Sequence, residues 1–317
     1  MRFLGVDSGA MNTECLVVNS DCEILGYGLS GGGNYHRVGK EAASINIQVC
    51  VEEAVSSVDM EEGKLDWGVY GISGLDCDED FEVYSDMLDF GLCKERTLVN
   101  HVVLTHYSVT AGDPGISVMA STGSIVYGVN SDAEDVRIGG WGYLVGDEGS
   151  GFYVARRGLQ EATKGYDGRR EETKLIEAAL DYFEIDSFED VFAQVYGEGG
   201  KEKPIAPFSE YVIELASEGD EVAKEIVDES CRELLKAVLA AKEELNLRGN
   251  FRVGLSGRLF SFEYFLSEFK REIKSEIPRA DIMDSITHPV VGAVALAAGK
   301  AGYKLALEDI KELDSKI

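Results

Sequence analysis

The segment 139–151, GGWGYLVGDEGSG, contains six glycines, one tryptophan and two adjacent carboxylates, Asp147 and Glu148. A glycine-rich backbone can approach a ligand closely because no Cβ stands in the way. Carboxylates accept hydrogen bonds, so this pair could bind the hydroxyl groups of a small polar ligand. A structural role is also open, because acidic residues are favoured at the positive end of a helix, here expected over 149–162. The two roles are compatible, and the segment predicts a small-molecule site at the start of a helix.

Glycine, serine and threonine gather at three other places, each at the end of an expected strand. The stretches are 7–10 (DSGA), 121–124 (STGS) and 254–257 (GLSG). Turns of this kind present backbone N–H groups and hydroxyls that can surround a phosphate. One such turn is more often only a turn. Three of them, with Asp7 at the end of the first strand, predict a site for a phosphorylated ligand.

Alternating strand and helix patterns must position these residues. The pattern restarts after Asp113-Pro114, so we expect an α/β protein of two βββαβα-like halves, with ligands at the carboxyl ends of the strands in the crevice between them. The expected domains are 1–112 and 113–317, the second enlarged by helices and the last helices packing back on the first domain. Strands are expected at 2–7, 14–19, 23–29, 67–72, 102–104, 115–122, 124–130 and 252–257, and helices at 39–58, 78–90, 149–162, 171–183, 187–196, 207–218, 220–245, 261–274 and 289–303.

Charge and composition exclude several classes of partner. The net charge is 30 − 58 = −28, which repels nucleic acids and anionic membrane surfaces. The six cysteines form no CxxC pair and are expected to be free thiols in a reducing compartment. Asp7 comes too early for the apolar region of a signal peptide, and no run of 18 residues is apolar enough to span a bilayer. We therefore expect a cytoplasmic protein that acts on a small molecule.

Together these motifs resemble a known fold. They are GVDSGAMNT (5–13), GN (33–34), SGLD (73–76), STGS (121–124), GGWGYLVGDEGSG (139–151), VGLSG (253–257) and HPVVGAVALA (288–297). The chain resembles the actin/hexokinase/Hsp70 nucleotide-binding fold over nearly its whole length. Within that fold it is most similar to the N-acetylglucosamine kinase-like group, which is classed with the BadF/BadG-type ATPases. The resemblance implies two ribonuclease H-like domains with a central cleft, use of ATP and Mg²⁺, and a homodimer.

The resemblance also implies roles for single residues. Asp7 would act in catalysis and position Mg²⁺ through water. The ATP-binding residues would be Ser8, Gly9, Ala10, Asn12, Thr13, Ser121, Thr122, Gly123, Ser124, Gly254, Ser256, Gly257 and Gly292. The sugar pocket would be lined by Asn34, Ser73, Gly74, Asp76, Gly140, Trp141 and Asp147.

Two departures from the family pattern bear on activity. In the first phosphate loop Met11 and Asn12 stand where a threonine and a lysine are usual, so a hydroxyl and a cation are lost. Related kinases also place a catalytic aspartate after the strand here expected at 102–104, and the matching position holds His106. A neutral imidazole is a competent general base, so His106 is one candidate for that role. Alternatively, His106 only forms a hydrogen bond at a strand end and the site turns over poorly; the remaining histidines, His36, His101 and His288, are expected to be structural.

The first hypothesis for function is a kinase that transfers the γ-phosphoryl group of ATP to a hydroxyl of a sugar or sugar acid. The acceptor could be an amino sugar such as N-acetylglucosamine or a sugar acid such as 2-keto-3-deoxygluconate. A sugar acid would need a cation in the pocket, for which Arg137, Arg156 and Arg157 are candidates. A second hypothesis is an ATPase that activates an electron-transfer enzyme, although no cysteine lies in a glycine-rich loop where a shared iron–sulfur cluster would need it. A third is a nucleotide- or sugar-binding protein without catalysis.

Overall fold

The computed structural model describes residues 1–60, 63–88, 91–171, 173–196, 205–283 and 288–317. The chain divides into two compact units. Unit 1 comprises Met1–Ser117 and Ile286–Ile317, and unit 2 comprises Val118–Ser285. Among the described residues, no helix combines the length and apolar character needed to cross a bilayer.

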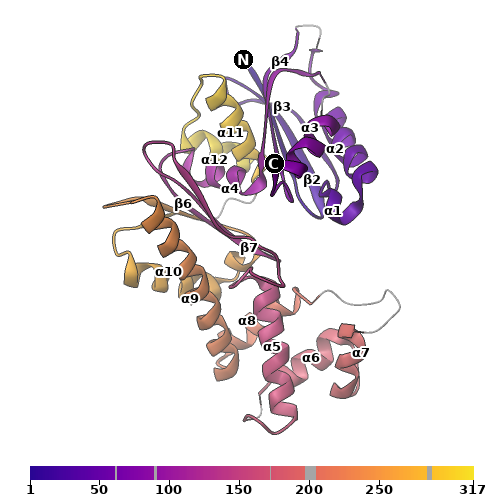
Figure 1. The fold of residues 1–317 in the computed structure, drawn as a ribbon, viewed down its shortest axis with the longest axis vertical. Helices are drawn as coiled ribbons and strands as arrows, with labels where there is room; N and C mark the ends of the chain where they lie inside the picture. The colour runs from indigo at the N-terminus through magenta and orange to yellow at the C-terminus, as the bar shows by residue number, and fades with distance from the viewer. Residues whose placement is uncertain (61–62, 89–90, 172, 197–204, 284–287) are drawn as a thin grey trace. The chain divides into compact units, whose positions relative to one another are not determined.

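Unit 1 is built on a five-stranded mixed sheet (Figure 1) with the strand order β3-β2-β1-β4-β5. The antiparallel part is a meander that short turns connect, whereas the parallel strands β4 and β5 each follow a helical connection, as parallel pairing requires. The strands are β1 (Arg2–Ser8), β2 (Asn12–Asn19), β3 (Ile24–Gly31), β4 (Leu65–Ile72) and β5 (Cys93–Asn100).

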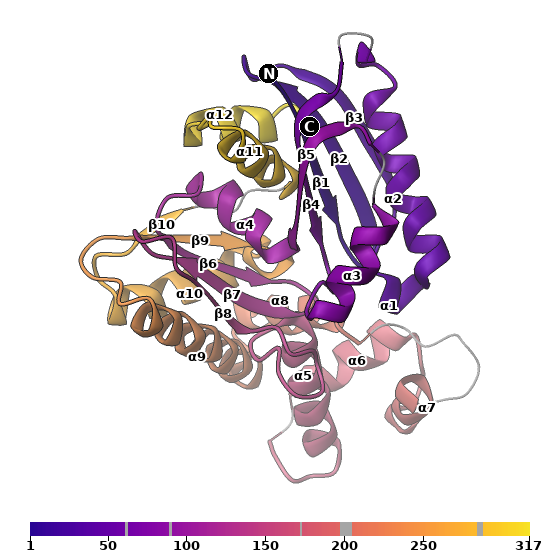
Figure 2. The same ribbon diagram turned by 45° about the horizontal axis from the view of Figure 1, so that its top comes forward.

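Helices cover both faces of this sheet (Figure 2). Alternation along the strands sends Leu4 and Val6 into one core and Phe3 into the other. The first core contains residues of α2 and α3, and the second contains residues of α4, α11 and α12. The helices of unit 1 are α1 (Tyr35–Val38), α2 (Lys40–Val55), α3 (Asp78–Met87), α4 (His101–Thr110), α11 (Val290–Lys300) and α12 (Leu307–Asp314).

Helices α4 and α11 cross so closely that one glycine is required between them. A Cβ on Gly292 would lie 2.0 Å from the carbonyl oxygen of Leu104 and 2.7 Å from the amide nitrogen of Ser108. Both neighbours are backbone atoms, so neither can move aside without shifting a helix. The close crossing by itself therefore accounts for a glycine at position 292.

We expect Gly292→Ala to lower the free energy of unfolding by about 3 kcal/mol, since overpacking against fixed backbone is among the costlier core changes. Gly299 lies on the same helix, and a Cβ added there would meet no atom within 4 Å. Gly299→Ala is therefore the matched control and should stabilise α11 by up to about 1 kcal/mol. Urea unfolding followed by circular dichroism measures both, and equal effects of the two substitutions would contradict the close crossing.

Unit 2 contains a second five-stranded mixed sheet. Its strand order, read as β8-β7-β6-β9-β10, repeats the order β3-β2-β1-β4-β5 of unit 1. The pairing also corresponds, since β7 and β8 are antiparallel and β9 and β10 are parallel. The expected α/β class with two ribonuclease H-like sheets is confirmed. The strands are β6 (Gly115–Ala120), β7 (Ser124–Val129), β8 (Asp135–Gly139), β9 (Arg252–Ser256) and β10 (Asp281–Met283).

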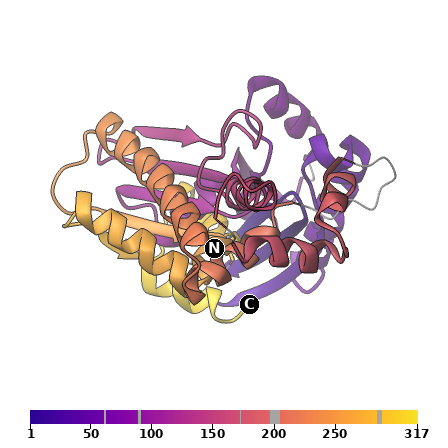
Figure 3. The ribbon, with the colours of Figure 1, turned by 90° about the horizontal axis from the view of Figure 1, so that it is seen from below.

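Additional helices enlarge unit 2, and Figure 3 shows α9 and α10 lying side by side. Helix α9 is the longest helix of the described chain and packs against β7, β8, α5, α8 and α10. The helices are α5 (Gly151–Tyr166), α6 (Leu175–Phe183), α7 (Val191–Tyr196), α8 (Phe208–Glu218), α9 (Glu221–Glu244) and α10 (Glu263–Glu276), with short 3₁₀ turns at Phe188–Asp190 and Arg258–Ser261.

One predicted element is wrong in a way that affects the site. Residues 102–104 belong to helix α4, and the strand is β5, immediately before it. Strand β5 was missed because it carries the charged run Lys94-Glu95-Arg96 near its start, as suits the edge strand of a sheet. The short elements α1, β8, β10 and α12 were also missed. Of the expected helices, residues 89–90 and 172 lie outside the described part of the chain.

Candidate active site

The β1–β2 turn holds the first glycine-rich stretch. Gly9 donates its N–H to the carbonyl of Asn12 at 2.8 Å, which closes the turn. The hydroxyls of Ser8 and Thr13 are 3.0 Å apart in the interior, and that of Thr13 also donates to the carbonyl of Gly31 at 2.9 Å. The buried side chains of Ser8 and Thr13 thus stabilise the base of the turn, and Asn12 is exposed at its tip.

Asp7, at the end of β1, meets a histidine that the sequence suggested to be structural. His101 begins α4 directly after β5, and its Nδ1 lies 3.0 Å from Oδ1 of Asp7. Both side chains are mostly buried, at 18% and 13% exposure. Burial alone would lower the pKa of His101, but the adjacent Asp7 carboxylate outweighs this and raises it. A carboxylate can only accept, so Nδ1 of His101 is the donor in this contact and Asp7 fixes the orientation of the ring.

His106, the base expected from sequence, lies elsewhere. It is in the body of α4 rather than at the end of a strand, and it is 0% exposed. Burial lowers its pKa to about 4. The residue that follows a strand and contacts Asp7 is therefore His101. A usable signal was Asn100, a favoured residue for the start of a helix, whose side chain accepts the N–H of Val102 at 3.0 Å.

The residues expected to bind sugar from unit 1 lie together around Ser8 and Asn100. The N–H of Ser73 donates to the carbonyl of Ser8 at 2.8 Å. The amide group of Asn34 lies against Gly74, where a Cβ would be 2.7 Å from Nδ2.

Asp76 joins the same group. Its Oδ1 accepts a hydrogen bond from Nδ2 of Asn100 at 3.0 Å. Asn100 directly precedes His101, so the four expected sugar-binding residues of unit 1 lie near the Asp7–His101 pair.

In unit 2 the STGS turn lies against the segment 139–151. A Cβ on Gly123 would be 2.7 Å from Oδ2 of Asp147. The other oxygen of Asp147 accepts the N–H of Gly142 at 3.1 Å, and Ser124 donates to the carbonyl of Glu148 at 2.7 Å. Asp147 has φ of 56°, a left-handed conformation that is uncommon for a residue with a side chain. The surrounding contacts hold its carboxylate beside the turn.

The expectation that this segment starts a helix is also correct in part. Helix α5 begins at Gly151, and Ser150 caps it by accepting the N–H of Tyr153 at 3.1 Å. The first turn also donates to the STGS turn, from Gly151 to the carbonyl of Ser121 at 2.7 Å and from Phe152 to that of Thr122 at 3.2 Å. These bonds tie the start of α5 to the predicted phosphate loop.

The third glycine-rich stretch reaches the same region of unit 2. A Cβ on Gly257 would lie 2.4 Å from the carbonyl oxygen of Ala120, the residue just before the STGS turn. Gly254 and Ser256 are buried in β9. The expected ATP-binding residues of unit 2 therefore gather at neighbouring strand ends, whereas Gly292 lies in unit 1 at the α4–α11 crossing.

Trp141 stands out from unit 2 and is 70% exposed. The guanidinium of Arg137 lies 5.1 Å from the centre of its ring and donates to the carbonyls of Gly139 and Gly140. A cavity of about 340 Å³ runs beside this loop, lined by Trp141 and by apolar residues that include Val145. An aromatic face beside a concave surface is a suitable contact for the apolar face of a sugar.

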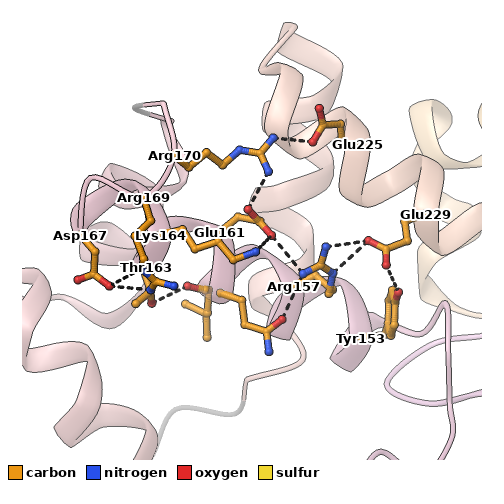
Figure 4. A network of polar contacts seen from close by, with 12 residues as sticks. Tyr153, Arg157, Glu161, Thr163, Lys164, Asp167, Arg169, Arg170, Glu225 and Glu229 are labelled. Carbon is orange, nitrogen blue, oxygen red and sulfur yellow. Dashed lines mark hydrogen bonds and ion pairs between the residues drawn. The ribbon is translucent and has the colours of Figure 1, made fainter.

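The other two candidate cations have different contacts. Arg157 pairs with Glu161 and Glu229, in the network of polar contacts that Figure 4 shows. Arg156 is exposed and lies over the ring of Tyr153. Of the three candidates, Arg137 is the cation beside Trp141.

The acidic residues near Asp7 fit a magnesium ion held through water and phosphate. Glu14 on β2 is the cross-strand register partner of Asp7 on β1. Its Oε2 is buried with no hydrogen-bond partner in the described part of the chain. Burial, with Asp7 adding to it, raises the pKa of Glu14. No group of three or more potential ligands is found among the described residues, but Mg²⁺ needs only one or two carboxylates when phosphates and waters complete its shell. Glu14 was not among the expected site residues.

Comparison with known proteins places the chain in a family. Residues 4–297 match the model of the BadF/BadG/BcrA/BcrD ATPase family. The chain belongs to this family. It is 29% identical over 298 residues to the N-acetylmuramic acid/N-acetylglucosamine kinase of Clostridium acetobutylicum, covering 93% of this chain and 97% of that one. It is 26% identical over 309 residues to the N-acetyl-D-glucosamine kinase of Dictyostelium discoideum, again covering 93% and 97%.

Solved structures agree on the fold. A Chromobacterium violaceum protein proposed to be an N-acetylglucosamine kinase superposes with a TM-score of 0.75 at 22% identity, covering 93% of this chain and 98% of that one. A ROK family glucokinase from Streptomyces griseus, in complex with glucose and AMPPNP, gives a TM-score of 0.56 at 16% identity, covering 94% and 100%. These likenesses support the two-domain actin-like ATPase fold.

Proposed function

We propose that this protein is an ATP-dependent sugar kinase that phosphorylates a hydroxyl of a small amino sugar such as N-acetylglucosamine. The observation that carries the proposal is the contact between His101 and Asp7 at the end of β1, beside Asn34 and Asp76. This contact places a candidate base of fixed orientation beside polar groups that could bind a sugar, in a chain that belongs to an ATPase family. Relatives named as amino-sugar kinases, at 29% and 26% identity, support the acceptor class.

In the proposed mechanism, the imidazole of His101 takes the proton of the attacking sugar hydroxyl while Asp7 orients the ring. Asn34 and Asp76 of unit 1 bind neighbouring hydroxyls, and a contact of Asp147 with the sugar stays a prediction. Magnesium, when bound near Asp7 through water, would neutralise charge on the phosphates.

In unit 1 the phosphates are assigned to the β1–β2 turn, whose tip is exposed at Met11 and Asn12 and would donate N–H groups to them. In unit 2 the STGS turn stays the second predicted phosphate loop. The adenosine is assigned to the strand end that contains Gly254, Ser256 and Gly257. Met11 and Asn12 leave the first turn without the usual hydroxyl and cation, so we infer a weaker hold on the phosphates rather than a different donor.

The charges near the candidate site favour a neutral acceptor over a sugar acid. In unit 1 the predicted sugar-binding group contains the acidic residue Asp76 and no cation. In unit 2 Asp147 and Glu148 are acidic, and Arg137 already donates to two backbone carbonyls beside Trp141. A carboxylate on the acceptor would be repelled unless Arg137 were redirected. We therefore infer that an uncharged amino sugar binds better than 2-keto-3-deoxygluconate.

The proposal is tested by ADP release from Mg·ATP with N-acetylglucosamine, glucosamine, glucose and 2-keto-3-deoxygluconate as acceptors. We expect release to be fastest with N-acetylglucosamine. Absence of release with every acceptor, from protein that still binds ATP, would support the alternative of a binding protein, for which Met11 and Asn12 are the motive. Iron in the purified protein would support the electron-transfer alternative, and light scattering in the same buffer tests the proposed homodimer.

A further inference from the structure

Helix α3 begins with a buried carboxylate that receives hydrogen bonds from two separate loops. Asp80 is 3% exposed, and its pKa is held well below the usual range. Burial opposes this lowering, but the hydrogen bonds that its carboxylate accepts outweigh it. A carboxylate at this position of a helix ordinarily accepts backbone N–H groups at the start of that helix. Asp80 also accepts hydrogen bonds from side chains of a second loop, so its contacts go beyond capping α3.

One carboxylate oxygen holds the loop that carries Asn34. Oδ1 of Asp80 accepts the hydroxyl of Tyr35 at 2.6 Å and lies 2.7 Å from Nε2 of His36. These residues directly follow Asn34, whose own side chain accepts the N–H of His36 at 3.0 Å.

The other oxygen holds the loop that carries Ser73, Gly74 and Asp76. Oδ2 of Asp80 accepts the backbone N–H of Asp76 at 3.0 Å and that of Cys77 at 3.1 Å. The thiol of Cys77 lies 3.2 Å from the same oxygen. A single carboxylate thus joins the two loops of unit 1 assigned to the sugar.

Tyr84, one turn later on α3, holds the first loop from its other side. Its hydroxyl accepts the N–H of Tyr35 at 3.0 Å and donates to the carbonyl of Gly33 at 2.9 Å. Asn34 therefore lies between two backbone groups that the same hydroxyl fixes. Tyr84 is 0% exposed, so this contact is built into the core rather than formed at the surface.

The same connection continues to the Asp7–His101 pair. Asp76, fixed by Asp80, accepts the side-chain amide of Asn100 at 3.0 Å, and Asn100 directly precedes His101. The chain of contacts runs from α3 through two loops to the assigned base.

We propose that Asp80 is a positioning residue that fixes the two acceptor-binding loops of unit 1 before the sugar arrives, with Tyr84 as its support. The inference rests on the proposed function for its acceptor class. The hydrogen-bond partners of Asp80 lie in the two loops 35–36 and 76–77 and include no residue assigned to ATP, so its loss should weaken acceptor binding selectively. Affinity is higher when a site is already ordered, because the loops need not lose freedom when the ligand binds.

The test compares Asp80→Asn with Glu79→Gln. Both remove one negative charge from the first turn of α3, but Glu79 is exposed and Asp80 is buried. An asparagine must turn its NH₂ group toward the donors of one loop or the other, so the hydrogen bonds to that loop are lost. We expect Asp80→Asn to raise the KM for the acceptor about tenfold or more, as misplacement of binding groups does, and to leave the KM for ATP within about twofold. Glu79→Gln should leave both constants unchanged.

Three further results decide the proposal. An unchanged acceptor KM in folded Asp80→Asn, or an equal rise in both KM values, would overturn it. If Asp80→Asn does not fold, Tyr84→Phe removes one hydroxyl and should raise the acceptor KM in the same direction. Hydrogen exchange without any sugar should be faster in both 33–36 and 73–77 of the variant. Hydrogen exchange needs no turnover, so it tests the role of Asp80 even if the wild-type protein phosphorylates no acceptor. The absence of turnover would contradict the proposed function and leave the role of Asp80 to be decided by the exchange rates.

Discussion

His101→Ala is expected to lower kcat for acceptor phosphorylation about 10²- to 10³-fold, within the range that a general base contributes. The physical reason is the 3.0 Å contact with Asp7, which fixes the ring at the end of β1. The KM values for ATP and acceptor should change little, because the ring accepts a proton in the transition state rather than holding either ligand. Steady-state ADP release at saturating ATP and sugar measures the effect.

The matched control is His106→Gln. This residue lies further along α4 with its ring 0% exposed. We expect it to lower the melting temperature while leaving kcat of the folded protein unchanged. If His106→Gln abolished turnover and His101→Ala retained it, the original assignment from sequence would stand and the structural one would fall.

These two histidines illustrate what local sequence patterns can predict. The glycine-rich turns were located correctly because glycine, serine and threonine act within a few residues of themselves. The base was assigned to His106 because Val102-Val103-Leu104 has the apolar character of a buried strand, which a buried helix segment shares. In the structure the strand is 93–100 instead, because this segment pairs with β4 although it carries charged residues near its start. The shift of one element moved the assigned position by five residues, from His106 to His101.

Contacts between distant segments could not be predicted. Asp80 was not singled out, because an acidic residue in the first turn of a helix is ordinary. Its partners at 35–36 lie far away in sequence and meet it only when α1 and α3 pack together. Arg157 was a candidate for the sugar pocket on sequence distance alone, and its ion pairs with Glu161 and Glu229 assign it to a different network.

That network joins α5 to α9 within unit 2 (Figure 4). Glu161, with a side chain 2% exposed, accepts hydrogen bonds from Arg157, Lys164 and Arg170. Arg157 also pairs with Glu229 on α9, whose other oxygen accepts the hydroxyl of Tyr153 at 2.7 Å, and Arg170 pairs with Glu225 on α9. Glu161 is the buried centre of these contacts, and the surrounding cations are partly exposed.

Glu161→Ala is expected to lower the free energy of unfolding by about 3 kcal/mol, the lower end of the range for breaking a buried ion pair. The lower end applies because Arg157 and Arg170 keep their partners on α9 and can contact water. Helix α5 should lose its fixed position against α9, so hydrogen exchange in both helices should quicken. Urea unfolding followed by circular dichroism measures the free energy.

Glu225→Gln is the control, since it removes a carboxylate from the same arginine at an exposed position and should cost less than about 1 kcal/mol. The pKa of Glu161 is lowered: burial opposes this, but Lys164 and Arg170 outweigh it. A carboxyl whose folded pKa lies below its unfolded value adds stability above the unfolded value, near 4.5, and loses it as pH falls through the folded one. The stability difference between wild type and Glu161→Gln should therefore be full at neutral pH and shrink as the solution is acidified below about pH 4.5. A stability difference that did not change as the solution is acidified would mean that Glu161 contributes by packing alone and that its three cations do not stabilise the fold.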